Sequence, residues 1–236
     1  ESFLASAEPL WRSGVEYHWH NRAYVDFDAF LAEFNRDKRK KIKQDRKKVR
    51  DQGVSFQWLL GDDCSDADWA FFNTCYRQTY REHHSSPYLN LAFFQKLGEV
   101  MPENVLLIVA RIAGEPVASA LFLLDAQRLY GRYWGSVAAI PNLHFEVCYY
   151  QAIEFCIARG LAAFEGGAQG EHKIARGLLP VRTHSAHWIA DTRFAEAIGA
   201  YLRRESAKVD DYLRSWQENS PLRMSSNGGE SDQDRR

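Results

Sequence analysis

The residues best suited to do chemistry are crowded into one short stretch, residues 164–180, which has the sequence FEGGAQGEHKIARGLLP. Its polar side chains, separated by four glycines, are Glu165, Gln169, Glu171, His172, Lys173 and Arg176. A glutamate can take a proton from an attacking amine, and histidine titrates near neutral pH. Lys173 and Arg176 are three positions apart, so on a helix they would share a face and hold a phosphate or carboxylate. The stretch thus predicts a general base (Glu165, Glu171 or His172) beside an anion-binding pair.

The same stretch has a purely structural interpretation, a polar turn whose charges pair with one another. Against it, a Gly-Gly turn after a short strand lets the backbone approach a ligand closely. Ligands also bind at the carboxyl ends of strands in open α/β sheets. Clustering so many polar groups costs desolvation free energy unless they have a functional partner. We therefore favour the functional interpretation. No G-x-x-x-x-G-K-S/T sequence is present, so this is not a Walker loop.

The stretch LHFEVCYYQ, residues 143–151, is a second candidate. On an α-helix His144, Cys148 and Gln151 share one face, and Glu146 lies in the first turn, where the helix dipole favours a carboxylate. We expect His144 and Glu146 to face a ligand. The alternative is that Glu146 only caps the helix and His144 forms a hydrogen bond in the core. Cys148 is not expected to be a nucleophile, because nothing nearby would lower its pKa.

Two predicted strands carry further candidates. Residues 128–137 alternate Tyr130, Arg132 and Trp134 on one face, and an arginine between two aromatic side chains needs an anionic partner. That partner is either Glu165 or Glu171, or a carboxylate or phosphate of a ligand. In the last strand Thr183 and His187 share a face with Ser185, and we expect one of the two histidines, His184 or His187, to face the site. No G-x-S-x-G elbow supports a serine hydrolase.

Charge is distributed unevenly along the chain. Residues 36–50, RDKRKKIKQDRKKVR, hold ten Lys or Arg against two Asp, a local charge of +8, so the remainder sums to −9 if the whole chain is −1. Two aspartates cannot balance ten cations on a solvated helix face. We therefore expect contact with a phosphate backbone, a lipid-linked precursor or an anionic membrane surface. Few aromatic residues are interleaved, so base recognition is not expected.

Composition limits the class of protein. The 236 residues are 45% hydrophobic and 14% aromatic, which is typical of a folded domain with a large core. No apolar run approaches the roughly 18 residues of a transmembrane helix. The four cysteines are widely spaced without a C-x-x-C pair, so we expect no metal site, no disulfide framework and a cytoplasmic, reducing environment.

The pattern of apolar residues predicts an α+β fold, a mixed sheet with a βαβ crossover in its second half. Strands are expected at residues 14–24, 54–61, 104–114, 115–126, 128–137, 161–168 and 183–190. Helices are expected at 27–52, which includes the basic segment, at 65–84 and 90–101, at 142–160, as a short turn near 171–177, and at 194–216. The start, ESFLASAEPLW, is expected to be a cut into a longer protein, and residues 219–236 a disordered tail.

Four stretches of the sequence are LHFEVCYYQ, GAQGEHKIARG, HWHNRAYVDFDAFLAEFNRDKRKKIKQDRKKV and LYGRYWGS. They resemble the bacterial FemAB-like, GNAT-related "peptidoglycan biosynthesis/recognition" proteins of the acyl-CoA N-acyltransferase superfamily. The resemblance covers most of residues 11–205 and is most specific in the first two stretches. It implies a GNAT/Fem-like mixed sheet flanked by helices. It further implies that residues 1–218 are the second of two acyltransferase-like halves, with a helical insertion at about 65–101 and an upstream half as partner.

The resemblance implies an N-acyltransferase that moves an acyl or aminoacyl group to an amine acceptor, in cell-wall peptide metabolism. Acyl-CoA is one donor, but WGSVAAIPNLHFE has only Gly135 where GNAT enzymes carry an R/Q-x-x-G-x-G/A pyrophosphate loop. This departure favours the alternative donor, aminoacyl-tRNA. Lys173, Arg176 and Arg132 would hold anionic groups and stabilise the oxyanion. The alternative function is a non-catalytic module that binds a cell-wall precursor or a nucleic-acid backbone.

Overall fold

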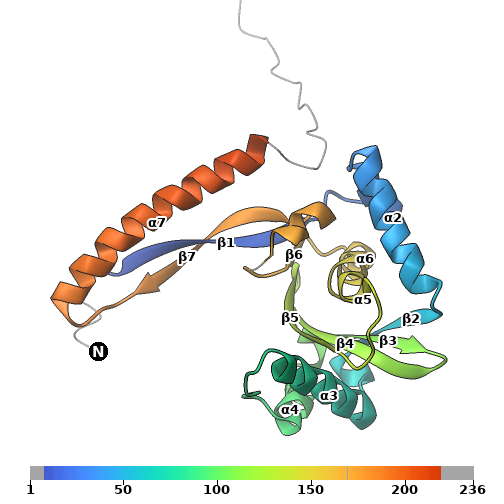
Figure 1. The fold of residues 1–236 in the computed structure, drawn as a ribbon. Coiled ribbons are helices and arrows are strands. Elements are labelled where there is room, and N and C mark those ends of the chain that lie inside the picture. Colours follow the sequence, from blue (N-terminus) through green and yellow to red (C-terminus); the bar gives the residue numbers. More distant parts are fainter. Residues whose placement is uncertain (1–7, 169, 219–236) are drawn as a thin grey trace, which may run out of the picture.

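The computed structural model describes residues 8–168 and 170–218, except for the side chains of Glu171, Gln217 and Glu218. The predicted tail, residues 219–236, and Gln169 lie outside the described residues. Within this range the chain forms one sheet of seven strands in the order β2-β3-β4-β5-β6-β1-β7, in which only β5 and β6 are parallel (Figure 1). The strands are β1 Leu10–His20, β2 Val54–Leu60, β3 Val105–Ile112, β4 Glu115–Leu124, β5 Arg128–Ser136, β6 Ala163–Glu165 and β7 Leu179–His187.

The meander β3-β4-β5 is the centre of the fold, as the sequence predicts. Residues 105–110 are fully buried because helices cover both faces of this part of the sheet. The hairpin between β3 and β4 turns at Ala113 and Gly114, both with positive φ. Between β4 and β5 the register shifts so that Arg132 has no opposite residue, which makes it the extra residue of a β-bulge.

Two helices cover one face of the meander and a third, irregular one covers the other (Figure 1). The first two are α3 Asp66–Glu82, which begins in a capping box formed by Ser65 and Asp68, and α4 Leu91–Val100. Their aromatic side chains pack on the sheet in a cluster that includes Trp69, Phe72, Tyr76 and Phe94. The predicted helices at 65–84 and 90–101 and the predicted α+β mixed sheet flanked by helices are therefore confirmed.

The helix on the other face is not a continuous α-helix. It consists of α5 Leu143–Phe145, a π-helical turn η3 Glu146–Tyr150 and α6 Gln151–Arg159, and it ends at Gly160 with positive φ. A π-turn inserts one extra residue into the helical repeat. Residues before and after η3 in the sequence therefore do not share the helix faces that α-helical spacing predicts for them.

The basic segment lies on a separate helix, which corrects the single helix predicted for residues 27–52. The chain forms α1 Phe27–Ala32 and then α2 Arg36–Arg50. The break occurs at Asn35, whose extended backbone and side-chain oxygen cap the amide of Lys38. An asparagine that bonds to the backbone in this way favours a helix start over a helix interior.

Helix α2 is anchored through a buried cation, Arg46. Its guanidinium donates to both carboxylate oxygens of Glu146 and to both of Glu154, with N···O distances of 2.7–3.1 Å. It also lies 4.3 Å from the centre of the Phe27 ring. Ile42 and Val49 complete the buried face of the helix. One of the ten cations of the basic segment thus joins α2 to η3 and α6 and is not on the surface.

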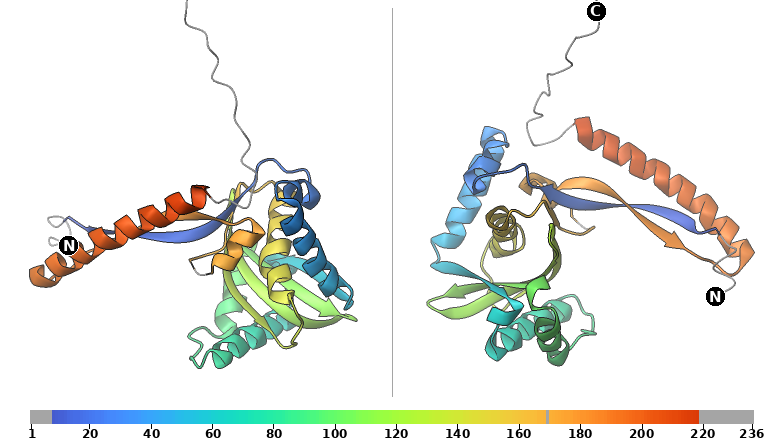
Figure 2. Two further views of the ribbon diagram at one scale, coloured as in Figure 1. Left: turned by 45° about the horizontal axis from the view of Figure 1, so that its top comes forward. Right: turned by 180° about the vertical axis from the view of Figure 1, so that it is seen from behind.

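Strands β1 and β7 and the long helix α7, Thr192–Glu218, project from the body as an arm (Figures 1 and 2). In the arm the two strands pair from Leu10↔His187 to His18↔Leu179. Helix α7 is fixed to β1 by Arg12 with Glu205 and by a 2.7 Å hydrogen bond between the hydroxyls of Tyr17 and Tyr212. The chain's first strand therefore lies between β6 and β7. The predicted apolar face of this helix is only partly covered, since two of its members, Phe194 and Tyr201, are 64% and 55% exposed.

The Arg46 network yields a stability prediction. Replacing Arg46 by Met should lower the free energy of unfolding by about 3–5 kcal/mol, because it leaves the carboxylate of Glu146 buried without its partner. Urea denaturation measures the loss. The matched control is Lys40→Met on the exposed side of the same helix, which should change stability by less than about 0.5 kcal/mol. An equal, small effect of both variants would show that the ion pairs do not hold α2.

Candidate functional site

A cleft opens where strands β5 and β6 separate. The two strands pair over three positions only, ending at Tyr130↔Glu165, and β5 continues to Ser136. Beyond Tyr130 this edge of β5 has no strand partner among the described residues. The cleft has a volume of about 150 Å³, and its lining includes Arg132, Trp134, His144, Cys148, Tyr149 and Gly166.

Arg132 is aimed by the β-bulge on β5. The extra residue of a bulge is unpaired and bends the strand locally, a device that often redirects a side chain next to a functional site. Arg132 is exposed and forms no ion pair with any described residue, so neither Glu165 nor another described carboxylate is the anionic partner expected for it. Trp134, two positions on, packs edge-on against the His144 ring with centroids 5.3 Å apart.

Two imidazoles and a phenol gather at the mouth of the cleft. Burial, followed by the positive charges nearby, lowers the pKa of His144 from 6.5 to about 4. Burial also lowers the pKa of His172, whose Nε2 lies 3.1 Å from the hydroxyl of Tyr149. Both histidines are therefore neutral at pH 7, and the more exposed His172 is better placed to accept a proton, because burial disfavours the charged form of His144. The thiol of Cys148 has its pKa raised by burial, which agrees with its exclusion as a nucleophile.

Lys173 and Arg176 are not a free anion-binding pair. The buried ammonium group of Lys173 donates to the carbonyls of Gly166 and Gly167 and so holds the turn after β6, where Gly167 has a φ of 79°. Burial lowers the pKa of this lysine. The guanidinium of Arg176 lies 3.4 Å from the centre of the Phe145 ring and donates to the carbonyl of His172. Both cations thus hold the loop that follows β6 and do not line the cleft.

Other predicted site residues lie elsewhere. Glu146, 1% exposed, and Gln151 belong to the Arg46 network on the far side of the helix, where the Gln151 amide donates to Glu146 and Glu154. The predicted ligand-facing position of Glu146 is therefore not observed. Thr183 and His187 lie on β7 in the arm: Thr183 is opposite Gly14, and His187 bonds to Ser185 at 2.8 Å. Gln169 and the Glu171 side chain are outside the described part of the structure.

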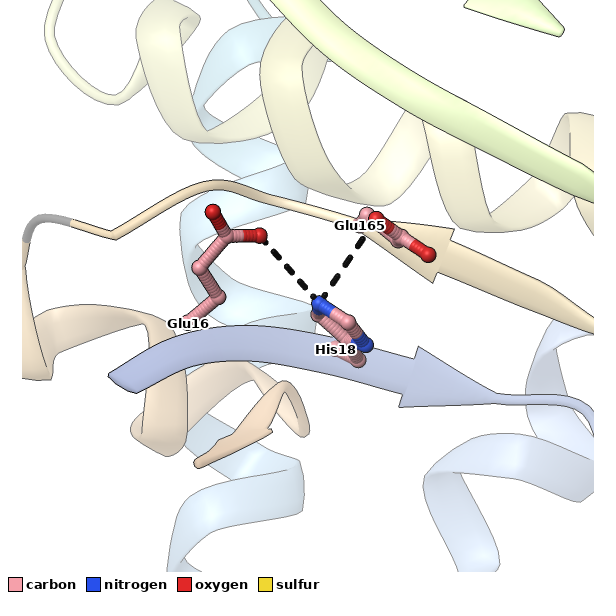
Figure 3. Close-up of side chains that lie close together, drawn as sticks. All are labelled: Glu16, His18 and Glu165. Carbon is pink, nitrogen blue, oxygen red and sulfur yellow. Dashed lines mark hydrogen bonds and ion pairs between the residues drawn. The ribbon is translucent and has the colours of Figure 1, made fainter. Parts of the chain in front are cut away.

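Glu165 lies on the face of β6 opposite to the cleft. Successive residues of a strand point to opposite faces, and Phe164 lines the cleft. The Glu165 carboxylate pairs with Arg128 and lies 3.8 Å from His18 of β1 (Figure 3). Tyr130, next to it on β5, donates its hydroxyl hydrogen to Asp125. Glu165, one of the predicted general bases, is therefore separated by the sheet from the two neutral histidines.

Sequence reasoning missed Tyr149 in the cleft and Glu16 and His18 beside Glu165. Tyr149 belongs to a segment whose sequence predicts a buried, apolar helix. Its hydroxyl faces His172 because the π-helical turn η3 changes the direction of its side chain. Glu16 and His18 alternate on the first strand, as in any half-buried strand. Nothing local in the sequence places that strand next to β6.

Comparison with known proteins identifies a family that matches the sequence and solved structures with a similar fold. The profile of the FemAB-like family, described as peptidoglycan biosynthesis/recognition, matches residues 1–224. The structure is similar to that of L-PGS from Bacillus licheniformis, with 12% identity, 82% of this chain and 66% of that chain covered, and a TM-score of 0.58. It is also similar to FemX, with 10% identity, 82% and 65% coverage, and a TM-score of 0.51.

At 12% and 10% identity, the similarities to these two solved structures show the fold alone. The chain spans about two thirds of the length of each of the two solved structures. No curated protein matches the sequence significantly. Among the helices of residues 8–218, none is both long enough and apolar enough to cross a lipid bilayer.

The lowered pKa of His144 predicts a pH dependence of stability. Between pH 6.5 and 4 the unfolded chain binds a proton at this residue and the folded chain does not, so stability falls as the pH falls through this window. The loss from this residue is on the order of 2–3 kcal/mol. Urea denaturation at pH 7 and pH 4.5 should show a smaller loss for His144→Gln than for the unaltered chain. Equal losses would mean that the folded state does not suppress protonation of His144.

Proposed function

Because the chain belongs to the FemAB-like family of peptidoglycan biosynthesis/recognition proteins, we propose that it transfers an acyl or aminoacyl group to an amine acceptor in the cleft between β5 and β6. The observation that carries the proposal is the edge of β5 beyond Tyr130, which has no strand partner among the described residues, although the Trp134 carbonyl there accepts a hydrogen bond from Thr79. Free backbone N–H and C=O groups along a strand edge bind an extended chain by adding it as a further strand. A donor arm that lies along β5 would bring its carbonyl between Trp134 and Tyr149.

The side chains of the cleft suit the proton transfers of this reaction. The acceptor nitrogen attacks the carbonyl carbon, an N–C bond forms and the C–O bond of an ester or the C–S bond of a thioester breaks. His172 takes the proton from the nitrogen, and the Tyr149 hydroxyl bonded to it passes a proton to the leaving oxygen or sulfur. Arg132, without an ion-pair partner in the described chain, stabilises the negative charge on the carbonyl oxygen or holds a phosphate of the donor.

Helix α2 favours aminoacyl-tRNA as the donor over acyl-CoA. Six of its cations form no ion pair with a described carboxylate: Arg36, Lys38, Arg39, Lys40, Lys48 and Arg50. A surface with this charge attracts a phosphate backbone through counterion release. The absence of a glycine-rich pyrophosphate loop before α5 points in the same direction. A tRNA donor places the reaction in the cytoplasm.

A second function, non-catalytic recognition of a cell-wall precursor, is favoured by one observation. No carboxylate lines the described part of the cleft, because Glu146 and Glu165 point away from it. A binding module needs no base, whereas the proposed transferase depends on His172 as its base. The two functions therefore differ in the effect of changing His172.

Ligand binding tests whether the cleft is the donor site. Thermal shifts would be measured with acetyl-CoA, a longer acyl-CoA, aminoacyl-tRNA and a lipid-linked muropeptide. A ligand present at about 100 times its Kd should stabilise the fold by roughly 2.7 kcal/mol. Arg132→Ala should abolish the shift given by the donor, whereas Arg77→Ala, an exposed arginine on α3, should retain it. A donor shift unchanged in Arg132→Ala would place the binding site outside the cleft.

His172→Gln separates the two functions. For a transferase the variant keeps the donor-induced thermal shift and loses about 10²–10⁴-fold in turnover, since only proton transfer is removed. Transfer of a radiolabelled aminoacyl group to the muropeptide would measure turnover. Binding without measurable transfer in the unaltered protein would identify the recognition module instead.

The basic helix predicts a salt effect. Lys38, Lys40 and Lys48 are exposed and unpaired within the described chain, and replacing all three by Gln should weaken tRNA binding. The slope of log K against log salt should become less steep by about 2–3 units, as expected for three lost phosphate contacts. Replacing Arg193, Arg203 and Arg204 of α7 by Gln is the charge-matched control. Equal slopes for both triple variants would exclude α2 as the contact surface.

A further inference from the structure

A second cluster of chemically capable side chains lies on the face of the sheet away from the cleft. Glu16 and His18 of β1 and Glu165 of β6 each turn one ligand atom towards the others, and these atoms all lie within 4.8 Å of one another (Figure 3). His18 and Glu165 are directly opposite in the antiparallel pairing of β1 and β6. The sheet itself fixes the cluster, because all three residues lie in paired positions of its strands.

The distances in the cluster are too long for good hydrogen bonds and suitable for metal coordination. Nε2 of His18 is 3.4 Å from Oε2 of Glu16 and 3.8 Å from Oε2 of Glu165. N–H···O bonds in proteins are shorter, at 2.7–3.2 Å. Two ligands bound at about 2.1 Å to a tetrahedral ion are about 3.4 Å apart, so a cation between the three side chains would need little rearrangement.

The surroundings leave these ligand atoms available. Arg128 pairs with Oε1 of Glu165, and Oε2 of that carboxylate is the atom that faces His18. Lys173, the other cation nearby, uses its ammonium group on the carbonyls of Gly166 and Gly167. The His18 side chain is 8% exposed, that of Glu165 17% and that of Glu16 35%, so the cluster is enclosed on the β6 side and open on the Glu16 side. Ions enter from that open side.

We propose that Glu16, His18 and Glu165 form a binding site for a divalent transition-metal ion of the zinc type. One imidazole and two carboxylates are a ligand set of zinc sites, and three protein ligands leave a coordination position for water or a ligand group. An imidazole ligand disfavours magnesium and calcium, which prefer oxygen alone. The ion ties the first strand of the chain to β6 immediately before the Gly166–Gly167 turn. The wide spacing of the cysteines predicts no metal site, and nothing local in the sequence brings β1 next to β6.

The test is metal binding by the tag-free 236-residue chain. Isothermal titration with Zn²⁺ should show one site, Mg²⁺ should show none at the same concentrations, and Co²⁺ should give the intense visible bands of a tetrahedral complex. Glu16→Gln and His18→Gln should each weaken Zn²⁺ binding by more than about 10-fold. Zn²⁺ should raise the Tm of the unaltered chain and leave the Tm of both variants unchanged.

Matched variants keep the test decisive. His187→Gln and Glu115→Gln change a histidine and a glutamate on the same sheet outside the cluster, and both should bind Zn²⁺ like the unaltered chain. Glu16 is the most exposed member, so Glu16→Gln is expected to fold even if His18→Gln does not, and circular dichroism checks each variant. The absence of Zn²⁺ binding in the unaltered chain, or binding that survives in folded Glu16→Gln and His18→Gln, would overturn the proposal. Because no step of the proposed transfer uses this ion, either result leaves the proposed function to its own tests.

Discussion

The position of η3 depends on one buried guanidinium. Arg46 on α2 bonds to Glu146 at the start of η3 and to Glu154 about two turns further on, so it fixes both the place and the rotation of this helix. Across the π-turn, Glu146 and Gln151 face α2 while His144 and Tyr149 face the cleft. A buried ion pair of this kind adds little net stability compared with an apolar contact, but it defines one orientation because its removal leaves a charge without a partner. The cleft owes the position of His144 and Tyr149 to that orientation.

The strands and most helices could be predicted from the sequence because their apolar periodicity is local. The meander, the two helices of residues 65–101 and the short turn at 171–176 all occur where the pattern predicts them. The helix at 142–160 was predicted, but its faces were not, since η3 shifts Gln151 out of line with His144. The basic segment shows the same limit. A list of charges cannot reveal that Arg46 is buried, because its partners are about a hundred residues away.

The candidate site was predicted in part for the same reason. His144, Arg132 and Trp134 meet in one cleft because they stand on adjacent elements, β5 and α5. Glu165 and His172 are close in sequence, yet the first faces away from the cleft and the second lies at its mouth. Strand β6 therefore separates the two predicted bases, with Glu165 on one face of the sheet and His172 on the side of the cleft. The chemistry of each face follows from its neighbours: aromatic rings around the histidines, and Arg128 and His18 around Glu165.

The place of β1 in the sheet has a consequence for how the protein assembles. This strand is synthesised before all the others, yet both of its neighbours, β6 and β7, are made of residues beyond 160. Contacts between residues this distant in sequence form slowly, because a long loop must close before they contribute any free energy. During translation the meander and its helices can fold from adjacent segments, while β1 waits with unpaired edges. Among the strands of the described sheet, the one made earliest is therefore paired last, and the interval is the period in which this sheet is most exposed to misassembly.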